Sequence, residues 1–402
     1  AAPDEPFSAP ITEFLPSVSV GWGASLQRNL AALNARVSPT IPIDPRITKI
    51  AHHIVEDIPR SATAGRARAL YRWVQANVAE GEESDGRRVV VGKSGNRWQA
   101  MIMLCRALGI TANFVVAKNR LASPIRGPLS EARAFGSAVL KIDAPSGPIW
   151  LTLDDKYGPF GYLPAELRGM PGYQLGLAKP QPVTLPNDGA QDTIFHEVDA
   201  TLAADGSAEL KLVQTFRGKP AVQLRKGLAE LPENRLHDVL ETQLLGRTFH
   251  GARLKKFKIV RQADADTPLA IEMTASAPAL AQPRGNQLTL SPPYTINLSQ
   301  VLTVPVRQTP LLIMETTHQV VRIRVAPPKG ATIAAPSALQ LNHAGYQLRI
   351  ADRLDKGALL LDREVLIPAG RVQPDAYAAF VDFARQSDAA QARNIVINLG
   401  QK

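Results

Sequence analysis

Apolar residues recur every three or four positions in the first part of the chain, which is the spacing of a buried helix face. Asp44 followed by Pro45 is a favoured helix start, and Gly109 is a favoured helix stop. The pattern between these signals predicts three helices, and a weaker pattern predicts one more before them. The four predicted helices cover about residues 25–35, 45–55, 61–78 and 97–108.

The last of these helices begins with a capping sequence. Asn96 is a favoured N-cap residue, and Gln99 stands three positions later, which is the spacing of a capping box. The apolar stripe of this helix consists of Trp98, Met101, Ile102, Cys105 and Leu108. The only cysteine of the chain is therefore predicted to lie two turns into the helix, whereas Arg97 holds the first position.

After Gly109 the apolar pattern changes to period two, which is typical of strands. The segments "TANFVVAKN", "FGSAVLKID" and "PIWLTLD" predict three strands, and the Pro-rich stretch at about residues 177–192 is a linker by composition. We predict a first domain over residues 1–184, with an N-terminal linker included. Its fold class is α+β, with three helices packed on a small antiparallel sheet.

From residue 185 to the end, strand patterns dominate. A hairpin is predicted at the Ala-Asp-Gly turn of residues 204–206, and helices are predicted at about 220–245 and 375–388. We therefore predict a β-rich second domain with two helices over residues 185–402. Whether this domain divides into two subdomains near residue 308 is left open.

The composition excludes several classes of protein. A single cysteine excludes an internal disulfide framework and a cysteine-rich metal site, and no apolar run approaches the ~18 residues that span a bilayer. The net charge is +10, but the basic residues are scattered, and 5% aromatic residues are too few for a base-stacking surface. We expect no nucleic-acid partner, no transmembrane segment in the chain itself, and a basic surface suited to an anionic envelope.

No motif for a metal, a phosphate or a nucleophile is complete. None of the histidines forms the His-Glu-x-x-His zinc pattern, and "GKSGNRW" lacks the glycine that a phosphate loop has five positions before Gly92. We predict no metal and no cofactor. Cys105 is either a thiol nucleophile or a small core residue, and its distance from the helix start favours the core.

Four segments resemble the transglutaminase-like superfamily of papain-fold thiol enzymes, in the degenerate bacterial version that precedes a β-rich domain. "ARALYRWVQANV" resembles the helix before the catalytic one, and "SGNRWQAMIMLCRALGI" resembles the Gly-Asp-Cys helix. "AFGSAVLKI" is similar to the strand that carries the general base, and "IWLTLDDKYGPFGYLP" to the Trp-Leu-Asp-Pro segment. The resemblance covers residues 40–180, extends more weakly to the β-rich region, and implies a papain-like core.

The catalytic positions depart from the motif of this superfamily. The resemblance places Arg97 where active members have cysteine, Ser137 where they have histidine, and Thr152 where they have aspartate, with Asp154 as the alternative carboxylate. Active members need a thiolate beside an imidazole, and neither a guanidinium nor a serine hydroxyl supplies this chemistry near neutral pH. We expect a degenerate site with no catalytic residue. Its candidate binding positions are Asn96, Arg97, Trp98, Ser137, Thr152 and Asp154.

The resemblance implies a catalytically inactive module of a multidomain bacterial envelope protein, acting in binding or as a scaffold. Arg97 would hold an anion through its fork of donors, or it would pair with Asp154 or Asp155. Two alternatives stay open. One is a thiol-dependent hydrolase or transamidase with an unrecognised site, and the other is a structural protein whose β-rich half is the functional part.

The expected partner is a protein, a peptide or an anionic envelope component. The expected location is extracytoplasmic, in the periplasm or the cell envelope. Because residues 1–40 resemble a linker that follows another β-rich domain, the chain is expected to be a C-terminal portion or a processed form.

Overall fold

Two compact units make up the chain in the computed structural model: residues 16–189, and residues 1–15 together with 190–402. They are called the smaller and the larger unit below, and each is described by itself. The structure describes residues 5–10, 13–14, 16, 18, 20, 22–23, 25–37, 42–124, 131, 134–187, 192–334 and 337–400. Of the helices in these ranges, none is both long and apolar enough to cross a membrane.

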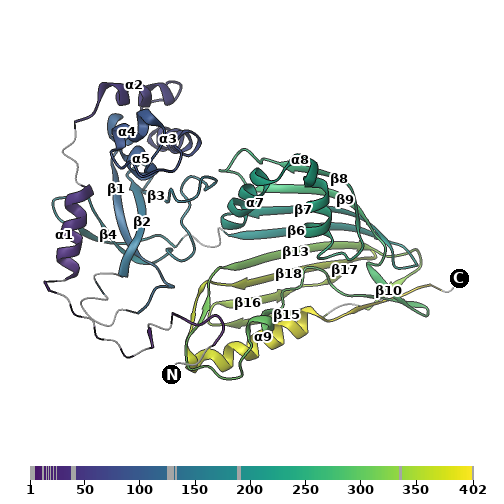
Figure 1. Ribbon diagram of the computed structural model, residues 1–402. Coiled ribbons are helices and arrows are strands. Elements are labelled where there is room, and N and C mark those ends of the chain that lie inside the picture. Colours follow the sequence, from purple (N-terminus) through teal and green to yellow (C-terminus); the bar gives the residue numbers. More distant parts are fainter. Residues whose placement is uncertain are drawn as a thin grey trace. The chain divides into compact units, whose positions relative to one another are not determined.

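The smaller unit consists of helices and one five-stranded sheet (Figure 1). Its described helices are α1 (Leu26–Val37), α2 (Pro45–Ile54), α3 (Thr63–Asn77), α4 (Gly86–Gly92) and α5 (Arg97–Ala107). Its strands are β1 (Ala112–Lys118), β2 (Phe135–Ile142), β3 (Ile149–Leu151), β4 (Pro171–Gln174) and β5 (Gln181–Thr184). The strand order is β3-β2-β1-β4-β5 with antiparallel pairing throughout, and the predicted α+β class is confirmed.

Both faces of this sheet are covered. Leu140 of β2 and Leu151 of β3 lie opposite each other and pack in one core with Met101 of α5. Val139 and Trp150, on the other face, pack in a second core with apolar residues between 163 and 185. The alternation along each strand thus divides its side chains between a helix layer and a loop layer.

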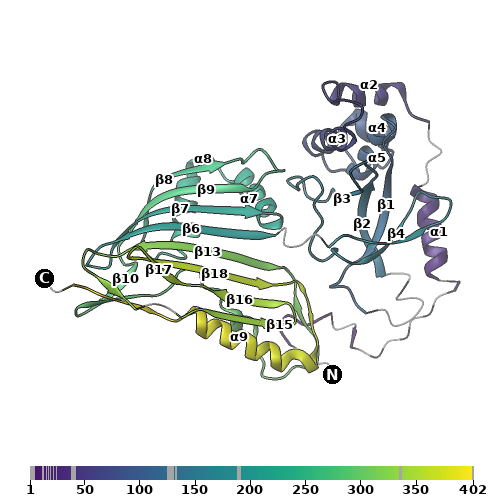
Figure 2. The ribbon, with the colours of Figure 1, turned by 180° about the vertical axis from the view of Figure 1, so that it is seen from behind.

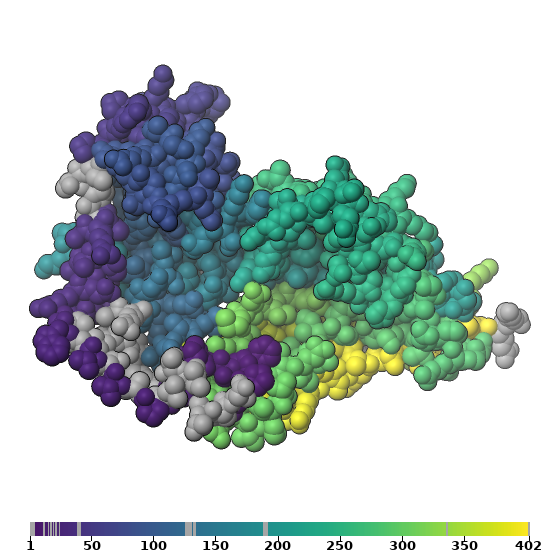
Figure 3. Space-filling view, viewed as in Figure 1, coloured from purple at the N-terminus to yellow at the C-terminus, as the bar shows by residue number. Residues whose placement is uncertain are grey.

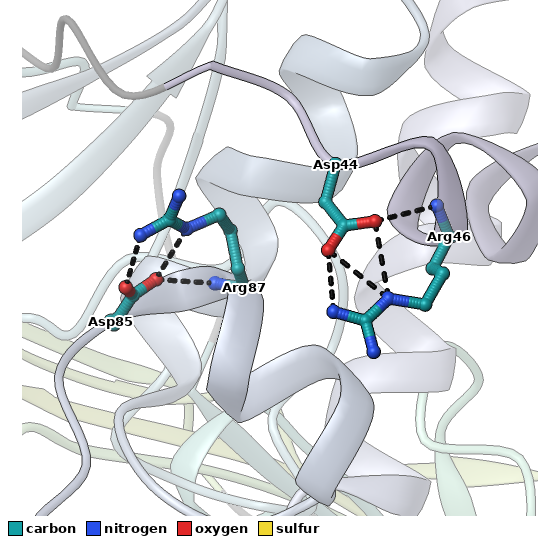
Figure 4. A network of polar contacts seen from close by, with 4 residues as sticks. All are labelled: Asp44, Arg46, Asp85 and Arg87. Atoms are coloured by element: carbon teal, nitrogen blue, oxygen red, sulfur yellow. Dashed lines mark hydrogen bonds and ion pairs between the residues drawn. The ribbon is translucent and has the colours of Figure 1, made fainter.

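Two helix starts in this unit use the same aspartate cap (Figure 4). The Asp44 carboxylate accepts the backbone N–H of Arg46, at 2.8 Å, and also its guanidinium at the start of α2. Asp85 makes the same two contacts with Arg87 at the start of α4. The sequence did not predict α4, because its seven residues, GRRVVVG, are too few to show a helical apolar stripe.

The larger unit contains more strands than the smaller one. Its first strands are β6 (Thr193–Leu202), β7 (Ala208–Arg217), β8 (Arg253–Val260), β9 (Leu269–Ala277), β10 (Ala281–Arg284), β11 (Gln287–Leu290) and β12 (Leu311–Ile313). Then follow β13 (Thr317–Ala326), β14 (Thr332–Ile333), β15 (Leu339–His343), β16 (Tyr346–Ile350), β17 (Arg353–Asp355), β18 (Ala358–Ile367), β19 (Gly370–Val372) and β20 (Ile395–Asn398). Its helical segments are α7 (Lys219–Glu230), α8 (Glu233–Val239), the π-helical η2 (Leu240–Leu245), η3 (Leu298–Val301), η4 (Pro374–Ala376) and α9 (Tyr377–Gln391).

A nine-stranded sheet is the main element of the larger unit. Its strand order is β15-β16-β18-β13-β6-β7-β9-β8, and β17 pairs with β18 (Figures 1 and 2). β6 and β13 pair in parallel, whereas the other pairings in this sheet are antiparallel. Since the parallel pair joins strands from before and after residue 308, a single sheet continues across the place where a division into subdomains had been left open.

The helices of the larger unit pack on one face of this sheet. Leu240 and Leu245 of η2 share a core with inward-facing residues of β6, β7 and β13, and Phe383 of α9 packs on Val365 and Leu348. In the space-filling view, atoms of the segment 219–245 lie over the strands on this side (Figure 3). The two predicted helical stretches therefore form, although the first is divided into α7, α8 and η2.

Residues near the N-terminus belong to the larger unit, not to the first domain as predicted. Ser8 forms a β-bridge with Leu311, and the Leu312 N–H donates to the carbonyl of Phe7 at 2.7 Å. The chain therefore leaves the larger unit near residue 15 and returns to it near residue 190, five residues beyond the predicted start of the second domain. The sequence could not predict that the N-terminal segment joins the larger unit, because so short a strand pairing produces no periodic pattern of apolar residues.

Candidate functional site

A glycine turn sets the start of α5. Gly95 has φ +127°, and a Cβ there would lie 2.5 Å from the carbonyl oxygen of Glu83, so other residues do not fit without a shift. The Ala79 N–H donates to the carbonyl of Lys93, and the Gly95 N–H donates to that of Ala79. These bonds fix the chain that leads into α5 against the end of α3.

Asn96 caps α5 as predicted. Its side-chain oxygen accepts the backbone N–H of Trp98 at 3.0 Å and that of Gln99 at 3.2 Å. The predicted capping box is wrong, because the Asn96 N–H donates to the carbonyl of Glu83 at 2.8 Å instead of to the Gln99 side chain. The loop before the helix thus supplies the acceptor that a capping box would have supplied.

Arg97 has the first position of α5, and its guanidinium is already bonded. Nε donates to the carbonyl oxygen of Val78 at 2.9 Å, and Nη1 lies 3.4 Å from Oε1 of Glu80. The side chain is only 10% exposed. The expected pairing with Asp154 or Asp155 is wrong, since Arg97 points instead to the segment that follows α3.

Trp98, the next residue, reaches the segment after β3. Its indole N–H donates to the carboxyl of Asp154, and its ring lies 6.1 Å from that of Phe114 on β1. Partial removal of water from the carboxyl, together with the charge of Asp155, raises the pKa of Asp154, while the indole bond opposes this shift. Trp98 and Asp154 are therefore the direct contact between the helix start and the end of β3.

Three side chains of α3 hold the segment after β3 in place. Tyr71 donates to the carbonyl of Gly158 at 3.1 Å, and Arg72 donates to the same oxygen at 3.1 Å. Gln75 donates to the carbonyl of Asp155 at 3.1 Å. All three bonds end on backbone carbonyl oxygens, so they do not use the carboxylate of Asp154, which contacts Trp98.

Ser137 lies on β2, the strand that pairs with β3. Leu151 pairs with Leu140 in the antiparallel ladder of β3 and β2. β3 ends at Leu151, and no strand pairing is described for Thr152 or Asp154. Because it alternates with Leu140 along β2, Ser137 lies on the strand face that carries Val139, and no described hydrogen bond or ion pair joins it to Asp154 or Arg97. Thr152 is buried, and its carbonyl accepts from Tyr71 at 3.4 Å.

Cys105 is a core residue. It is 0% exposed in the core between α5, the other helices and the sheet, and burial raises the pKa of its thiol to about 12. A neutral thiol without access to solvent does not act as a nucleophile near neutral pH. The interpretation that the spacing favoured is therefore confirmed.

The site as a whole offers hydrogen-bond donors and one carboxylate. The contacts described for Arg97, Trp98 and Asp154 include neither a thiol nor an imidazole. In the described part of the chain, no group of three or more His, Cys, Asp and Glu side chains is placed to hold a metal ion. Such an arrangement can bind and orient a polar group, but it lacks a nucleophile–base pair.

Sequence reasoning missed the residues that support the site. Glu80 and the carbonyl of Val78 neutralise and hold Arg97, and Tyr71 and Gln75 hold the segment after β3. The polar Tyr71 and Gln75 lie on the face of α3 that buries Leu70 and Val74, and a buried polar side chain usually has a specific partner. Polar residues on an otherwise apolar helix face were therefore the signal in the sequence that could have identified Tyr71 and Gln75.

Comparisons with known proteins give a similarity of fold only. No family model matches the chain, and no curated protein matches it. A crystal structure of a protein from Parabacteroides distasonis, described as a "putative protease", superposes with a TM-score of 0.53 at 9% identity. The superposition covers 96% of this chain and 64% of that one, so the chain spans less than two thirds of the length of that protein.

A second solved structure, baculovirus P35, gives a TM-score of 0.14 at 6% identity, over 52% of this chain and 96% of that one. A similarity at this level carries no argument. The comparisons thus agree with the mixed α+β architecture, and they say nothing about the chemistry of the site.

Proposed function

We propose that the smaller unit is a transglutaminase-like domain that has kept its fold and lost its catalysis, and that it acts by binding or as a scaffold. The start of α5 carries this proposal. Arg97 stands there, held by the Val78 carbonyl and Glu80, where a thiol enzyme needs its nucleophile beside the positive end of the helix. The third member of such a site, a carboxylate, would be retained as Asp154.

The charge of the smaller unit supports a binding partner with negative groups. Residues 16–189 contain 21 lysines and arginines against 13 aspartates and glutamates, which accounts for most of the chain's net charge of +10. A positive surface attracts anionic partners over the range of a Debye length. The proposed partner is a protein, a peptide or an anionic envelope component, and the proposed location is periplasmic or otherwise extracytoplasmic.

A thiol hydrolase that uses Cys105 is the competing proposal, and the burial of this residue speaks against it. Its side chain is 0% exposed, and the pKa of its thiol is about 12. Substrate would reach the sulfur only after part of the helix layer opened.

Alkylation of the full chain tests the two proposals against each other. We expect iodoacetamide to leave Cys105 unmodified at pH 7.5 in the folded protein and to modify it fully in urea, with mass spectrometry as the readout. We also expect neither hydrolysis of casein nor incorporation of an amine into it. Rapid modification of the folded protein, or turnover that is lost in Cys105→Ala, would establish the thiol enzyme instead.

A further inference from the structure

One face of the nine-stranded sheet in the larger unit forms a trough. The helices of this unit pack on the opposite face, as the core residues of α9 and η2 show. The trough has a volume of about 1010 Å³ and is lined by residues of β6, β7, β8, β9, β13, β17 and β18. Figure 2 shows how these strands lie side by side across the unit.

A basic row crosses the floor of the trough. The strand register aligns one residue from each of seven neighbouring strands into a line perpendicular to them: Lys256, Thr274, Lys211, Asp199, Arg324, Leu360 and Arg353. Every second residue of this line is a lysine or arginine. Since neighbouring strands lie ~4.8 Å apart, the positive charges recur at roughly 10 Å.

A second row lies beside the first, two residues further along each strand. It consists of Lys258, Glu272, Val213, Glu197, Arg322 and Asp362. Half of its members are acidic, and the two rows lie ~7 Å apart. The charged side chains of the first row are therefore basic apart from Asp199, and the second row is mixed, with the carboxylates of Glu197, Glu272 and Asp362 beside Lys258 and Arg322.

The basic side chains of the first row are available to a ligand. Lys211, Lys256 and Arg324 are exposed, and the described ion pairs of the sheet include none of these three. Arg353 lies 3.8 Å from Asp362 and is 57% exposed. Charges held in a concave surface concentrate the field and attract an oppositely charged ligand.

The geometry points to an acidic polysaccharide as the ligand of this trough, with its chain laid across the strands. A disaccharide repeat has about the length of two strand spacings, roughly 10 Å, so one carboxylate per disaccharide would meet each cation of the basic row. Sugar hydroxyls over the second row would donate to its carboxylates. This inference does not rest on the function proposed for the smaller unit, and its failure would leave that proposal untouched.

Other polymers fit the trough less well. Side chains on one side of an extended peptide recur at ~7 Å, which does not match the interval of the cations. The strands that floor the trough, apart from the edge strands β8 and β17, are paired on both sides, so a peptide cannot add to them as a further strand. Among the described residues that line the trough, Phe257 is the one aromatic residue. One aromatic ring is too few for the base stacking that binding of single-stranded nucleic acid needs.

Binding of fluorescent hyaluronan fragments to the full chain tests the inference, because hyaluronan carries one carboxylate per disaccharide. We expect a rise in fluorescence anisotropy at low salt, a weaker rise at higher salt, and no competition by neutral dextran. The variant Lys211→Gln/Arg324→Gln should weaken binding at least tenfold.

The matched control is Lys226→Gln/Arg235→Gln, which removes the same charge from exposed positions on α7 and α8. It should change the affinity less than twofold, and both variants should keep the wild-type unfolding midpoint, because all four side chains are exposed. Equal losses in the two variants, no binding at low salt, or tighter binding of oligo(dT) or polyglutamate than of hyaluronan would overturn the inference.

Discussion

Arginine at the start of α5 is an unusual choice of residue. The first turn of a helix carries a partial positive charge that favours anions and disfavours a guanidinium. At Arg97, the Val78 carbonyl and the Glu80 carboxylate offset this unfavourable interaction of the guanidinium with the helix end. Arg97 thereby connects the start of α5 to the segment at the end of α3. At the residue scale, Arg97 therefore has a structural role at the start of α5.

Trp98 gives a prediction at the same scale. The change Trp98→Phe keeps an aromatic ring against Phe114 and removes the indole bond to Asp154. We expect a loss of about 1 kcal/mol in the free energy of unfolding and a further rise in the pKa of Asp154, because the bond that lowers it is gone. Urea unfolding and NMR titration of the Asp154 carboxyl measure the two effects.

The control for Trp98→Phe is Trp73→Phe, which alters a partly buried ring packed against the same core and should leave the pKa of Asp154 in place. A raised pKa means that the folded state binds the proton more tightly than the unfolded state. The contribution of Asp154 to stability therefore falls as the pH rises from the ordinary pKa through the raised one. An unchanged pKa in Trp98→Phe would show that the indole contact is not formed in solution.

At the scale of elements, the spacing of apolar residues predicted those helices and strands that are long enough to show a period. α2, α3, α5 and β1–β3 are long or regular enough for their apolar residues to show a stripe or an alternation. α4 is too short for this, and the true partner of the Asn96 N–H, Glu83, is 13 residues away and set by a glycine turn. The site was predicted only as far as local segments resemble a family, since Glu80 and Tyr71 act through contacts that no local pattern encodes.

The cap of α4 gives the prediction for this scale. Asp85→Ala removes the acceptor of the Arg87 N–H and guanidinium, and we expect a loss of about 1 kcal/mol at pH 7 in urea unfolding. The Arg87 side chain is the main cause that lowers the pKa of Asp85 to about 2. The stabilisation is therefore complete above the ordinary pKa and disappears as the pH falls through about 2.

Asp57→Ala, at an exposed position with no described hydrogen bond or ion pair, is the matched control and should change stability by less than ~0.5 kcal/mol. A difference between wild type and Asp85→Ala that stayed constant down to pH 2 would exclude the charged cap as its cause.

At the scale of the whole molecule, the larger unit depends on residues from both ends of the described chain. Glu5 accepts the backbone N–H groups of Gln308 and Thr309 and lies 3.7 Å from the buried guanidinium of Arg307. The smaller unit is thus bounded on both sides by chain that belongs to the larger unit. Composition and periodicity could not predict this connection, because it rests on a few residues of irregular chain.

Glu5→Ala should destabilise the larger unit although its residues 190–402 are unchanged. Removal of the carboxylate leaves Arg307 buried without its charged partner, and we expect a loss on the order of 3 kcal/mol. Hydrogen exchange at the amides of β12 should also become faster. Glu230→Ala, at an exposed position, is the control, and equal exchange rates in the two variants would contradict the anchoring of the N-terminal segment.

The most direct test of the central claim, that the start of α5 is a decayed thiol site, is the pKa of a thiol restored there. The rate of iodoacetamide modification as a function of pH gives this pKa in Arg97→Cys and in Arg97→Cys/Ser137→His, while buried Cys105 stays unmodified. Arg97→Ser reports whether the fold survives the loss of the guanidinium contacts.

We predict a thiol pKa below the ordinary ~8.5 in the single variant, because of the helix terminus, and a lower value still in the double variant, where the resemblance to thiol enzymes places an imidazolium beside the thiolate. Identical values in the two variants would show that Ser137 does not adjoin the start of α5. That result would contradict the account of this site as the remnant of a thiol enzyme.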